Sequence, residues 1–175
     1  MGTIKNSAFV KLIAGLIAAP GVLIEEVLEI LAGRYGPIDV RSETIPFTFT
    51  DYYAPEMGNN LLRQWVAFER LVSPDALGDI KIATNGIEND FLLNNARQVN
   101  IDPGYLTQAN LVLASTKEFS HRIYVGHGIY GEVTLIYKGK SFTPLPWTYP
   151  DYQSDAALRF LNAARSKYQL QLKEK

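Results

Sequence analysis

The hydrophobic period of this chain changes repeatedly along its first hundred residues, and this limits the folds open to it. Residues 9–18 form an apolar run closed by Pro20 and Gly21, which predicts a central strand buried on both faces. The period then changes to 3.6, which predicts an amphipathic helix ending at Gly33 or Gly36. The apolar positions of this helix are Ile24, Val27, Leu28, Leu31 and Tyr35.

The next segments return to a period of two. Ser42–Thr50 alternates and predicts a strand, and Pro46 favours a sheet edge because proline cannot donate to a strand ladder. Residues 51–60 have a loop composition, and Leu62–Val72 predicts a third strand.

A second helix and a fourth strand complete this half of the chain. Ser73, followed by Pro74 and an acid, is typical of a helix start, and we expect this helix to end near residues 94–95. Arg97–Asp102 alternates again and predicts a strand that stops before a Pro-Gly turn at residues 103–104.

The resulting order is strand, helix, strand, strand, helix, strand, which predicts an α+β fold with a ferredoxin-like (split βαβ) sandwich. We expect one domain over residues 1–175, with the ferredoxin-like unit at 8–107 and a C-terminal extension at 108–175 packed on it. The extension predicts further strands and a final helix that begins at Ser154, while residues 108–116 fit a strand or a short helix equally.

Composition excludes several classes of protein. The formal net charge is -1, so the chain as a whole has no positive electrostatic field that would attract nucleic acid or an anionic membrane. The chain has no cysteine, which excludes disulfides and thiolate chemistry and is compatible with a cytoplasmic location. The run at residues 9–19 resembles a signal peptide core, but Lys11 interrupts it, and no apolar run is long enough to span a bilayer.

Two glycine motifs look chemical but have the wrong context. Residues 126–131 match G-x-G-x-x-G, yet they lead into a predicted strand instead of the helix that a dinucleotide site needs, which favours a plain hairpin. Residues 139–141 read Gly-Lys-Ser, but Thr134 stands where a P-loop needs its first glycine. His121 and His127 are the only histidines, so we expect no multi-histidine metal site.

A polar group of side chains remains as the candidate site. Asn100 and Asp102 share one strand face, opposite the apolar face that meets the helices. The Asp102 carboxylate either points into a ligand site or stabilises the predicted turn by accepting hydrogen bonds from the backbone N–H groups of the turn.

The C-terminal extension supplies possible partners for this pair. Lys117 and Arg122 could clamp an anion, with Asp102 or His121 as acid or base, and Glu132 lies in the same segment. Tyr149 belongs to an aromatic stretch, residues 146–152, which lines a pocket or locks the last helix onto the sheet.

Eight motifs, taken in order, resemble a prokaryotic family of uncharacterised proteins, the domain of unknown function 4416. They are Phe49-Thr50-Asp51-Tyr52-Tyr53, Glu56-Met57-Gly58, Phe68-Glu69-Arg70-Leu71, Val99 to Tyr105, Leu113 to Lys117, His121-Arg122-Ile123-Tyr124, Gly128-Ile129-Tyr130 and Trp147 to Tyr152. The resemblance implies a small cytosolic bacterial or archaeal protein and brings no established activity or cofactor. The motif residues it brings are Asp51, Glu69, Arg70, Asn100, Asp102, Lys117, His121, Arg122 and Tyr149.

Two functions of different classes follow as expectations. The first is a site between the sheet and the C-terminal strands for a small anionic ligand, phosphorylated or not, with acid-base chemistry. The second is a regulatory or homodimeric assembly module, which predicts an exposed apolar patch that includes Trp65, Trp147 or Tyr149.

Overall fold

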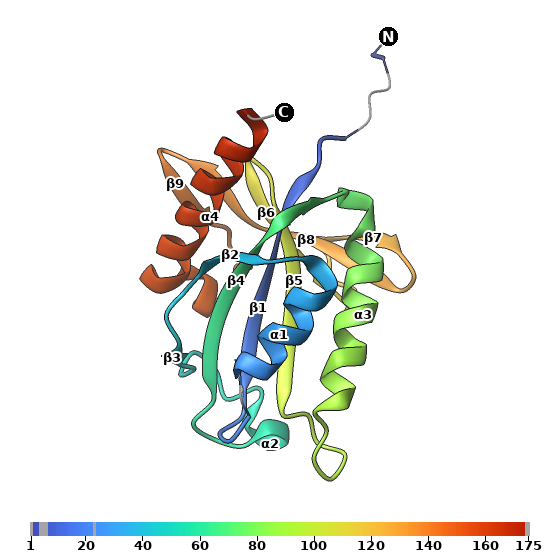
Figure 1. Ribbon diagram of the computed structural model, residues 1–175, viewed down its shortest axis with the longest axis vertical. Helices are drawn as coiled ribbons and strands as arrows, with labels where there is room; N and C mark the ends of the chain where they lie inside the picture. The colour runs from blue at the N-terminus through green and yellow to red at the C-terminus, as the bar shows by residue number, and fades with distance from the viewer. Residues whose placement is uncertain (1, 4–6, 23, 174–175) are drawn as a thin grey trace.

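The computed structural model describes residues 2–3, 7–22 and 24–173, and Figure 1 shows how their helices and strands are arranged. In chain order the elements are β1 (Val10–Ala18), α1 (Ile24–Tyr35), β2 (Ile38–Arg41), β3 (Ile45–Pro46), α2 (Ala54–Met57), β4 (Leu62–Val72), the 3₁₀ turn η1 (Pro74–Ala76), α3 (Leu77–Asp90), β5 (Val99–Leu106), β6 (Asn110–Ser115), β7 (Arg122–Gly126), β8 (Ile129–Lys138), β9 (Ser141–Pro144), the 3₁₀ turn η2 (Pro150–Gln153) and α4 (Asp155–Lys173). The protein is a mixed α/β structure built on one large antiparallel sheet.

The sheet runs in the order β2-β4-β1-β5-β6-β8-β7, with β3 paired to β4 and β9 paired to β8. β1 lies inside the sheet between β4 and β5, and all of its residues are buried, which confirms the expectation of a strand covered on both faces. Side chains alternate between the two faces of such a strand, so β1 contributes to two separate cores.

One face of the sheet is covered by α1 and α3, which Figure 1 shows in front of the central strands. Leu12 and Leu16 of β1 pack there with Val27 and Leu31 of α1. The helix α1 spans the predicted range, and Gly36 ends it with a left-handed φ of 98°, a conformation that glycine adopts without steric cost.

The opposite face is covered in part by α4, whose Phe160 and Leu161 pack on Ile13 and Trp65. Ser154 caps this helix, since its hydroxyl accepts from the Ala157 N–H. The strands of the C-terminal extension do not form a second layer. They lengthen the same sheet beyond β5, and the ambiguous segment at 108–116 contains a strand, β6.

One predicted strand and one predicted loop differ from the structure. Only Ile45–Pro46 of the predicted strand 42–50 pairs, as the edge strand β3, while the preceding Ile38–Arg41 forms β2. The predicted loop at 51–60 includes the short helix α2, which begins with Pro at an early position.

The predicted turn at residues 103–104 is wrong, because β5 continues through it to Leu106. Pro103 is tolerated here because backbone groups alternate in direction along a strand. The N–H and C=O of Ile101 point away from β1, toward α3. Pro103 lies two residues further along the strand, so its nitrogen points the same way, and the missing N–H is not needed for pairing with β1. The helix α3 also ends earlier than predicted, at Asp90.

The sheet opens between β5 and β6. Pairing of these strands starts only at Gly104, which lies opposite Leu113, and continues to Leu106. Residues 99–103 of β5 therefore have β1 on one side and no strand on the other. This opening is the feature that positions the candidate site.

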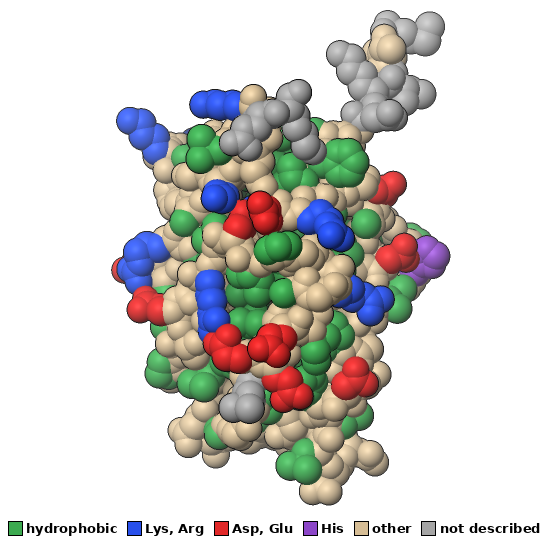
Figure 2. All heavy atoms as spheres, in the orientation of Figure 1, with side chains coloured by type: hydrophobic (Ala, Val, Ile, Leu, Met, Phe, Trp, Pro, Cys, Tyr) green, Lys and Arg blue, Asp and Glu red, His purple; other side chains and the backbone are tan. Residues whose placement is uncertain are grey.

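Charges of both signs are interspersed on the face that carries α1 and α3, as Figure 2 shows, in keeping with the balanced composition. No helix within residues 2–3, 7–22 and 24–173 has the length and apolar character needed to cross a membrane.

Candidate functional site

A pocket of about 550 Å³ lies where β5 and β6 part. This volume falls within the range of small-molecule sites, about 300–1,000 Å³. Its walls come from α3, from β5, from the end of β6 and from the segments around residues 47–53 and 149–152. The lining residues are Ile17, Phe47, Thr50, Tyr52, Tyr53, Lys81, Asn85, Glu88, Asn89, Arg97, Asn100, Asp102, Leu113, Ala114, Ser115, Thr116, Lys117, Glu132, Tyr149, Pro150, Asp151 and Tyr152.

Two side chains of α3 replace the missing strand beside β5. The Lys81 ammonium donates to the Ile101 carbonyl at 2.7 Å, and the Ile101 N–H donates to Glu88 Oε1, also at 2.7 Å. Both α3 side chains are buried, so these bonds satisfy backbone groups that would otherwise be left unpaired away from water. The open edge of β5 is thereby held by charged groups at the pocket wall.

Arg97 closes this wall at its far end. Its guanidinium donates to both Glu56 oxygens, at 2.8 and 2.7 Å, and to Asn100 Oδ1 at 3.1 Å. It also lies 3.6 Å from Glu88 Oε2. Burial raises the pKa of Glu88 above its ordinary value, against the opposing effect of the nearby Lys81 ammonium.

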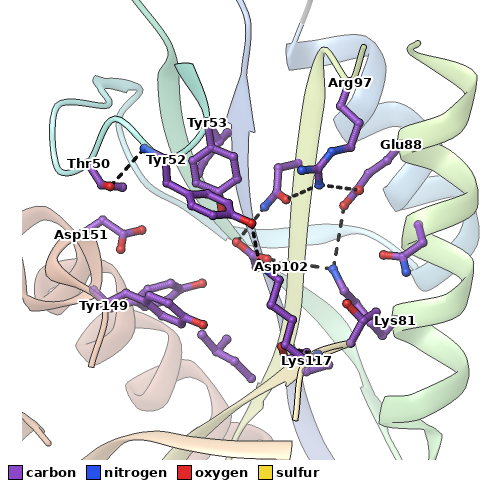
Figure 3. A pocket seen from close by; sticks show the side chains of 18 of the residues that line it. Thr50, Tyr52, Tyr53, Lys81, Glu88, Arg97, Asp102, Lys117, Tyr149 and Asp151 are labelled. Carbon is purple, nitrogen blue, oxygen red and sulfur yellow. Dashed lines mark hydrogen bonds and ion pairs between the residues drawn. The ribbon is translucent and has the colours of Figure 1, made fainter. Parts of the chain in front are cut away.

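The floor of the pocket contains two carboxylates that share one arginine. Arg63 Nη2 lies 2.7 Å from Asp151 Oδ2, and Arg63 Nη1 lies 3.8 Å from Asp102 Oδ2. The guanidinium carbon stands 4.7 Å from the centroid of Trp65 and 5.0 Å from that of Tyr152, so two rings hold the cation. Figure 3 shows Asp102 between Asp151 on one side and the α3 side chains on the other.

Polar atoms of this floor have unused hydrogen-bonding capacity. The Arg63 side chain is fully buried, and beyond its ion pairs with Asp151 and Asp102 none of its nitrogens has hydrogen-bond geometry to a described residue. The Tyr152 hydroxyl is buried beside it. Gly15 of β1 makes room for both groups, because a Cβ there would lie 2.6 Å from the Tyr152 hydroxyl and 2.7 Å from Arg63 Nη2. Burial raises the pKa of Asp151, and the neighbouring Asp102 adds to this, while Arg63 opposes it.

The wall opposite α3 is organised by Glu132 of β8, which is 1% exposed. Its Oε2 lies 2.9 Å from His121 Nε2 and accepts from Arg122 Nε at 2.8 Å, and its Oε1 accepts from the Thr134 hydroxyl at 3.0 Å. The His121 ring also stacks on Trp147, with centroids 4.9 Å apart.

Arg122 extends from this carboxylate to the pocket rim. It donates to the Ser115 hydroxyl at 3.0 Å and to the Tyr149 hydroxyl at 2.6 Å, which fixes the Tyr149 ring at the lining. Burial raises the pKa of Tyr149, so this phenol stays protonated.

The mouth is marked by Lys117, an exposed residue just beyond β6. Its ammonium lies 2.5 Å from the Tyr52 hydroxyl and 4.6 Å from the Tyr52 ring centroid. It forms no ion pair with any carboxylate of the described residues, unlike Lys81 and Arg97 in the same pocket.

The structure brings the site residues predicted from sequence to one place, at two depths. Asn100, Asp102, Lys117, Glu132 and Tyr149 line the pocket. His121 and Arg122 do not line it. They lie behind Glu132 and Tyr149 and hold these side chains in position. The direct ligand contact expected of His121 and Arg122 therefore has no counterpart in the pocket lining. Asp102 does not brace a turn. It lies within β5 and accepts from the Asn100 side chain at 2.9 Å.

Several pocket residues escaped the sequence analysis. Lys81, Asn85 and Glu88 are spaced four and three residues apart on α3, so their polar face was readable from helical periodicity. The Asn85 side chain makes no hydrogen bond to the described residues and is free to meet a ligand. Asp151 stood within the aromatic stretch 146–152, but Arg63 is a charge inside a buried strand, and no local pattern reveals its partner.

The glycine-rich segment is a turn between β7 and β8, and Gly126, His127 and Gly128 all have left-handed φ values of 109°, 55° and 76°. It leads into a strand, as expected from its sequence. Within the described parts of the chain, no group of three or more His, Asp or Glu side chains is arranged to hold a metal ion.

Comparison with known proteins gives one match. Neither the curated proteins nor the solved structures contain a significant match to the chain. The family described as Domain of unknown function (DUF4416) matches residues 8–168, which is nearly the whole chain and includes all the lining residues. The chain therefore belongs to the DUF4416 family.

Proposed function

We propose that the protein binds a small anionic ligand, such as a phosphorylated metabolite, in the pocket between β5 and β6. The observation that carries this proposal is Lys117. It is a cation at the mouth that no described carboxylate neutralises, so it can pair with a ligand anion without first breaking an ion pair.

The pocket also supports acid-base chemistry on the bound ligand. Asp151 and Asp102 lie together at the floor, and burial raises the pKa of Asp151. A buried carboxyl group with a raised pKa can hold a proton and donate it to a bound ligand as a general acid. His121, which was the other candidate for this role, would act only through Glu132.

The test is a calorimetric and thermal-shift screen with inorganic phosphate, sugar phosphates and small carboxylic acids. Specific binding raises the unfolding midpoint by mass action. In Lys117→Gln we expect the affinity of every hit to fall about tenfold or more, which corresponds to a charge-assisted hydrogen bond of about 1.4 kcal/mol.

The matched control is Lys138→Gln, which removes another exposed lysine, at the end of β8 and outside the lining. Its affinity should equal that of the unmodified protein. Equal affinity in Lys117→Gln and Lys138→Gln would remove the basis of the proposal.

A second candidate is homodimer assembly through β7, and a surface observation favours it. β7 is the last strand of the sheet order, and its Ile123 and Tyr124 are 72% and 59% exposed, beside Phe119 at 62%. Of the rings expected in such a patch, Trp65 is fully buried, whereas Trp147 and Tyr149 are partly exposed. Light scattering of the protein and of Ile123→Lys decides this candidate, because a monomer in both samples contradicts it.

We further propose that residues 8–107 keep the ferredoxin-like arrangement. The antiparallel order β2-β4-β1-β5 with α1 and α3 on one face supports this. A cytoplasmic location is also proposed, in keeping with the cysteine-free sequence.

A further inference from the structure

The pocket has two ends of opposite charge. Around the floor, three cations (Arg63, Lys81 and Arg97) face four carboxylates (Glu56, Glu88, Asp102 and Asp151), so the formal balance is negative. At the mouth and the wall behind it, Arg122 pairs with Glu132, while Lys117 pairs with no carboxylate of the described residues, so the formal balance of these three groups is positive. A ligand that carries an anion at one end and hydrogen-bond donors at the other matches both ends.

The floor also limits which kind of hydrogen-bond donor the ligand can carry at that end. Asp102 is an acceptor that is still accessible, since its side chain is 28% exposed and, among the described residues, its Oδ1 has an ion pair only with Lys81, at 4.0 Å. Among the donors that line the pocket, the Asn85 amide makes no hydrogen bond to the described residues, and the Lys81 ammonium lies on the same side as Asp102 Oδ1. The Arg63 guanidinium lies behind the lining, paired with Asp151 and Asp102.

A ligand ammonium could pair with Asp102 but would leave the Asn85 amide without an acceptor, and it would place another cation beside Arg63 and Lys81. A ligand hydroxyl can donate to the carboxylate and accept from a neighbouring donor at the same time. Since an unpaired buried polar group is costly, hydroxyl groups match the floor better than an amine.

The aromatic lining fits the carbon skeleton of such a ligand. Tyr52 and Tyr53 lie edge to face with centroids 5.0 Å apart, and Phe47 packs on Tyr53 at 5.7 Å. Tyr149 lies on another side of the pocket, as Figure 3 shows. Rings with a polar tip offer an apolar surface without excluding hydroxyl groups.

We propose that the ligand is a hydroxylated anion, a sugar phosphate or a sugar acid, whose anionic group binds at Lys117 and whose hydroxyl groups bind to Asp102 and the Asn85 amide. This inference rests on the proposed function, because it assumes that the anion binds at the mouth. It adds the class of the ligand, its orientation and the residues that discriminate.

The experiment is isothermal titration with ribose 5-phosphate, glucose 6-phosphate, glycerol 3-phosphate, gluconate, glucose and inorganic phosphate, together with the amines phosphoserine and putrescine. At least one hydroxylated anion should bind about tenfold more tightly than inorganic phosphate, glucose or either amine. Preference for the phosphates or for gluconate then separates the two sources of the anion. Tighter binding of an amine, or equal binding of inorganic phosphate and all the hydroxylated anions, would overturn the inference.

The variants separate this inference from the proposed function. Asp102→Asn should weaken the hydroxylated anion about tenfold and leave inorganic phosphate unchanged, whereas Lys117→Gln should weaken both. Asn85→Ala, which changes a partly exposed side chain and keeps the fold, should weaken only the hydroxylated anion. The control is Asp79→Asn, an exposed acid of α3 outside the lining, which should change nothing.

If Lys117→Gln weakens binding but Asp102→Asn and Asn85→Ala do not, the hydroxyl orientation is wrong and the anion site stands. If no phosphate or carboxylate probe binds, or Lys117→Gln leaves their binding unchanged, the anion site itself is wrong and the inference falls with it.

Discussion

Gly104 offers the sharpest test of the architecture, because it lies where β5 and β6 first pair. A Cβ at this position would overlap the Val112 carbonyl oxygen and would lie 2.6 Å from Leu113 Cδ2. The carbonyl belongs to the backbone of β6 and cannot turn away as a side chain would. In Gly104→Ala the two strands must therefore separate at the edge of the pocket.

Overpacking of this kind costs about 1–3 kcal/mol. For a chain of this size, each kcal/mol lowers Tm by about 2–4 °C, so Gly104→Ala should lower Tm by about 2–12 °C. The assay is thermal unfolding followed by circular dichroism, with urea unfolding to obtain the free energy.

The matched control is Gly86→Ala, in the interior of α3. No atom lies within 4 Å of a Cβ built there, and alanine is the better helix former, so stability should rise by about 0.5–1 kcal/mol. If Gly104→Ala unfolds at the temperature of the unmodified protein, the close approach of β5 and β6 is refuted.

Two further predictions concern the buried charges of the pocket. Lys81→Met removes the donor to the Ile101 carbonyl and should cost about 1–3 kcal/mol in urea unfolding, whereas Lys138→Met at an exposed site should stay within about 0.5 kcal/mol of the unmodified protein; equal costs would contradict the role of Lys81. Burial raises the folded-state pKa of Asp151 above 3.8, so the native state binds this proton more tightly than the unfolded state, and the free energy of unfolding should fall as pH rises from about 3.8 through the folded pKa. Asp151→Asn removes this titrating group, so between about pH 4 and pH 7 the free energy of unfolding, measured with urea, should fall less in the variant than in the unmodified protein. An equal or larger fall in the variant would contradict the raised pKa.

The elements that sequence predicts well are those with a strong local period. β1, α1 and β4 have their expected places because each carries a long apolar run or stripe. β3 is shorter than its alternation indicates, since pairing depends on which residues reach β4 and not on the pattern alone. The Pro103-Gly104 pair reads as a turn in sequence, but tertiary pairing with β1 keeps the strand extended.

The candidate site shows the same division. Strand alternation indicated Asn100 and Asp102, the polar segment that follows indicated Lys117, and the aromatic stretch indicated Tyr149; all four line one pocket and also belong to the family motifs. The depth of a side chain is not encoded in such motifs, and His121 lies behind Glu132 for a reason that only the strand pairing of β7 with β8 supplies. Long-range partners such as Arg63 and Asp151 could not be paired from sequence, because about half of the chain separates them.

The parting of β5 from β6 has a mechanical consequence. Within the described chain, strands on the two sides of this opening are joined only by the three paired positions from Gly104 to Leu106. A molecule bound in the opening would contact both the Lys81–Glu88 side and the Ser115–Lys117 side, and it would therefore link the two parts of the sheet. Ligand binding would then make the whole sheet more rigid. Amide exchange would slow when the pocket is filled, even in the parts of β6 and β8 that lie far from the ligand.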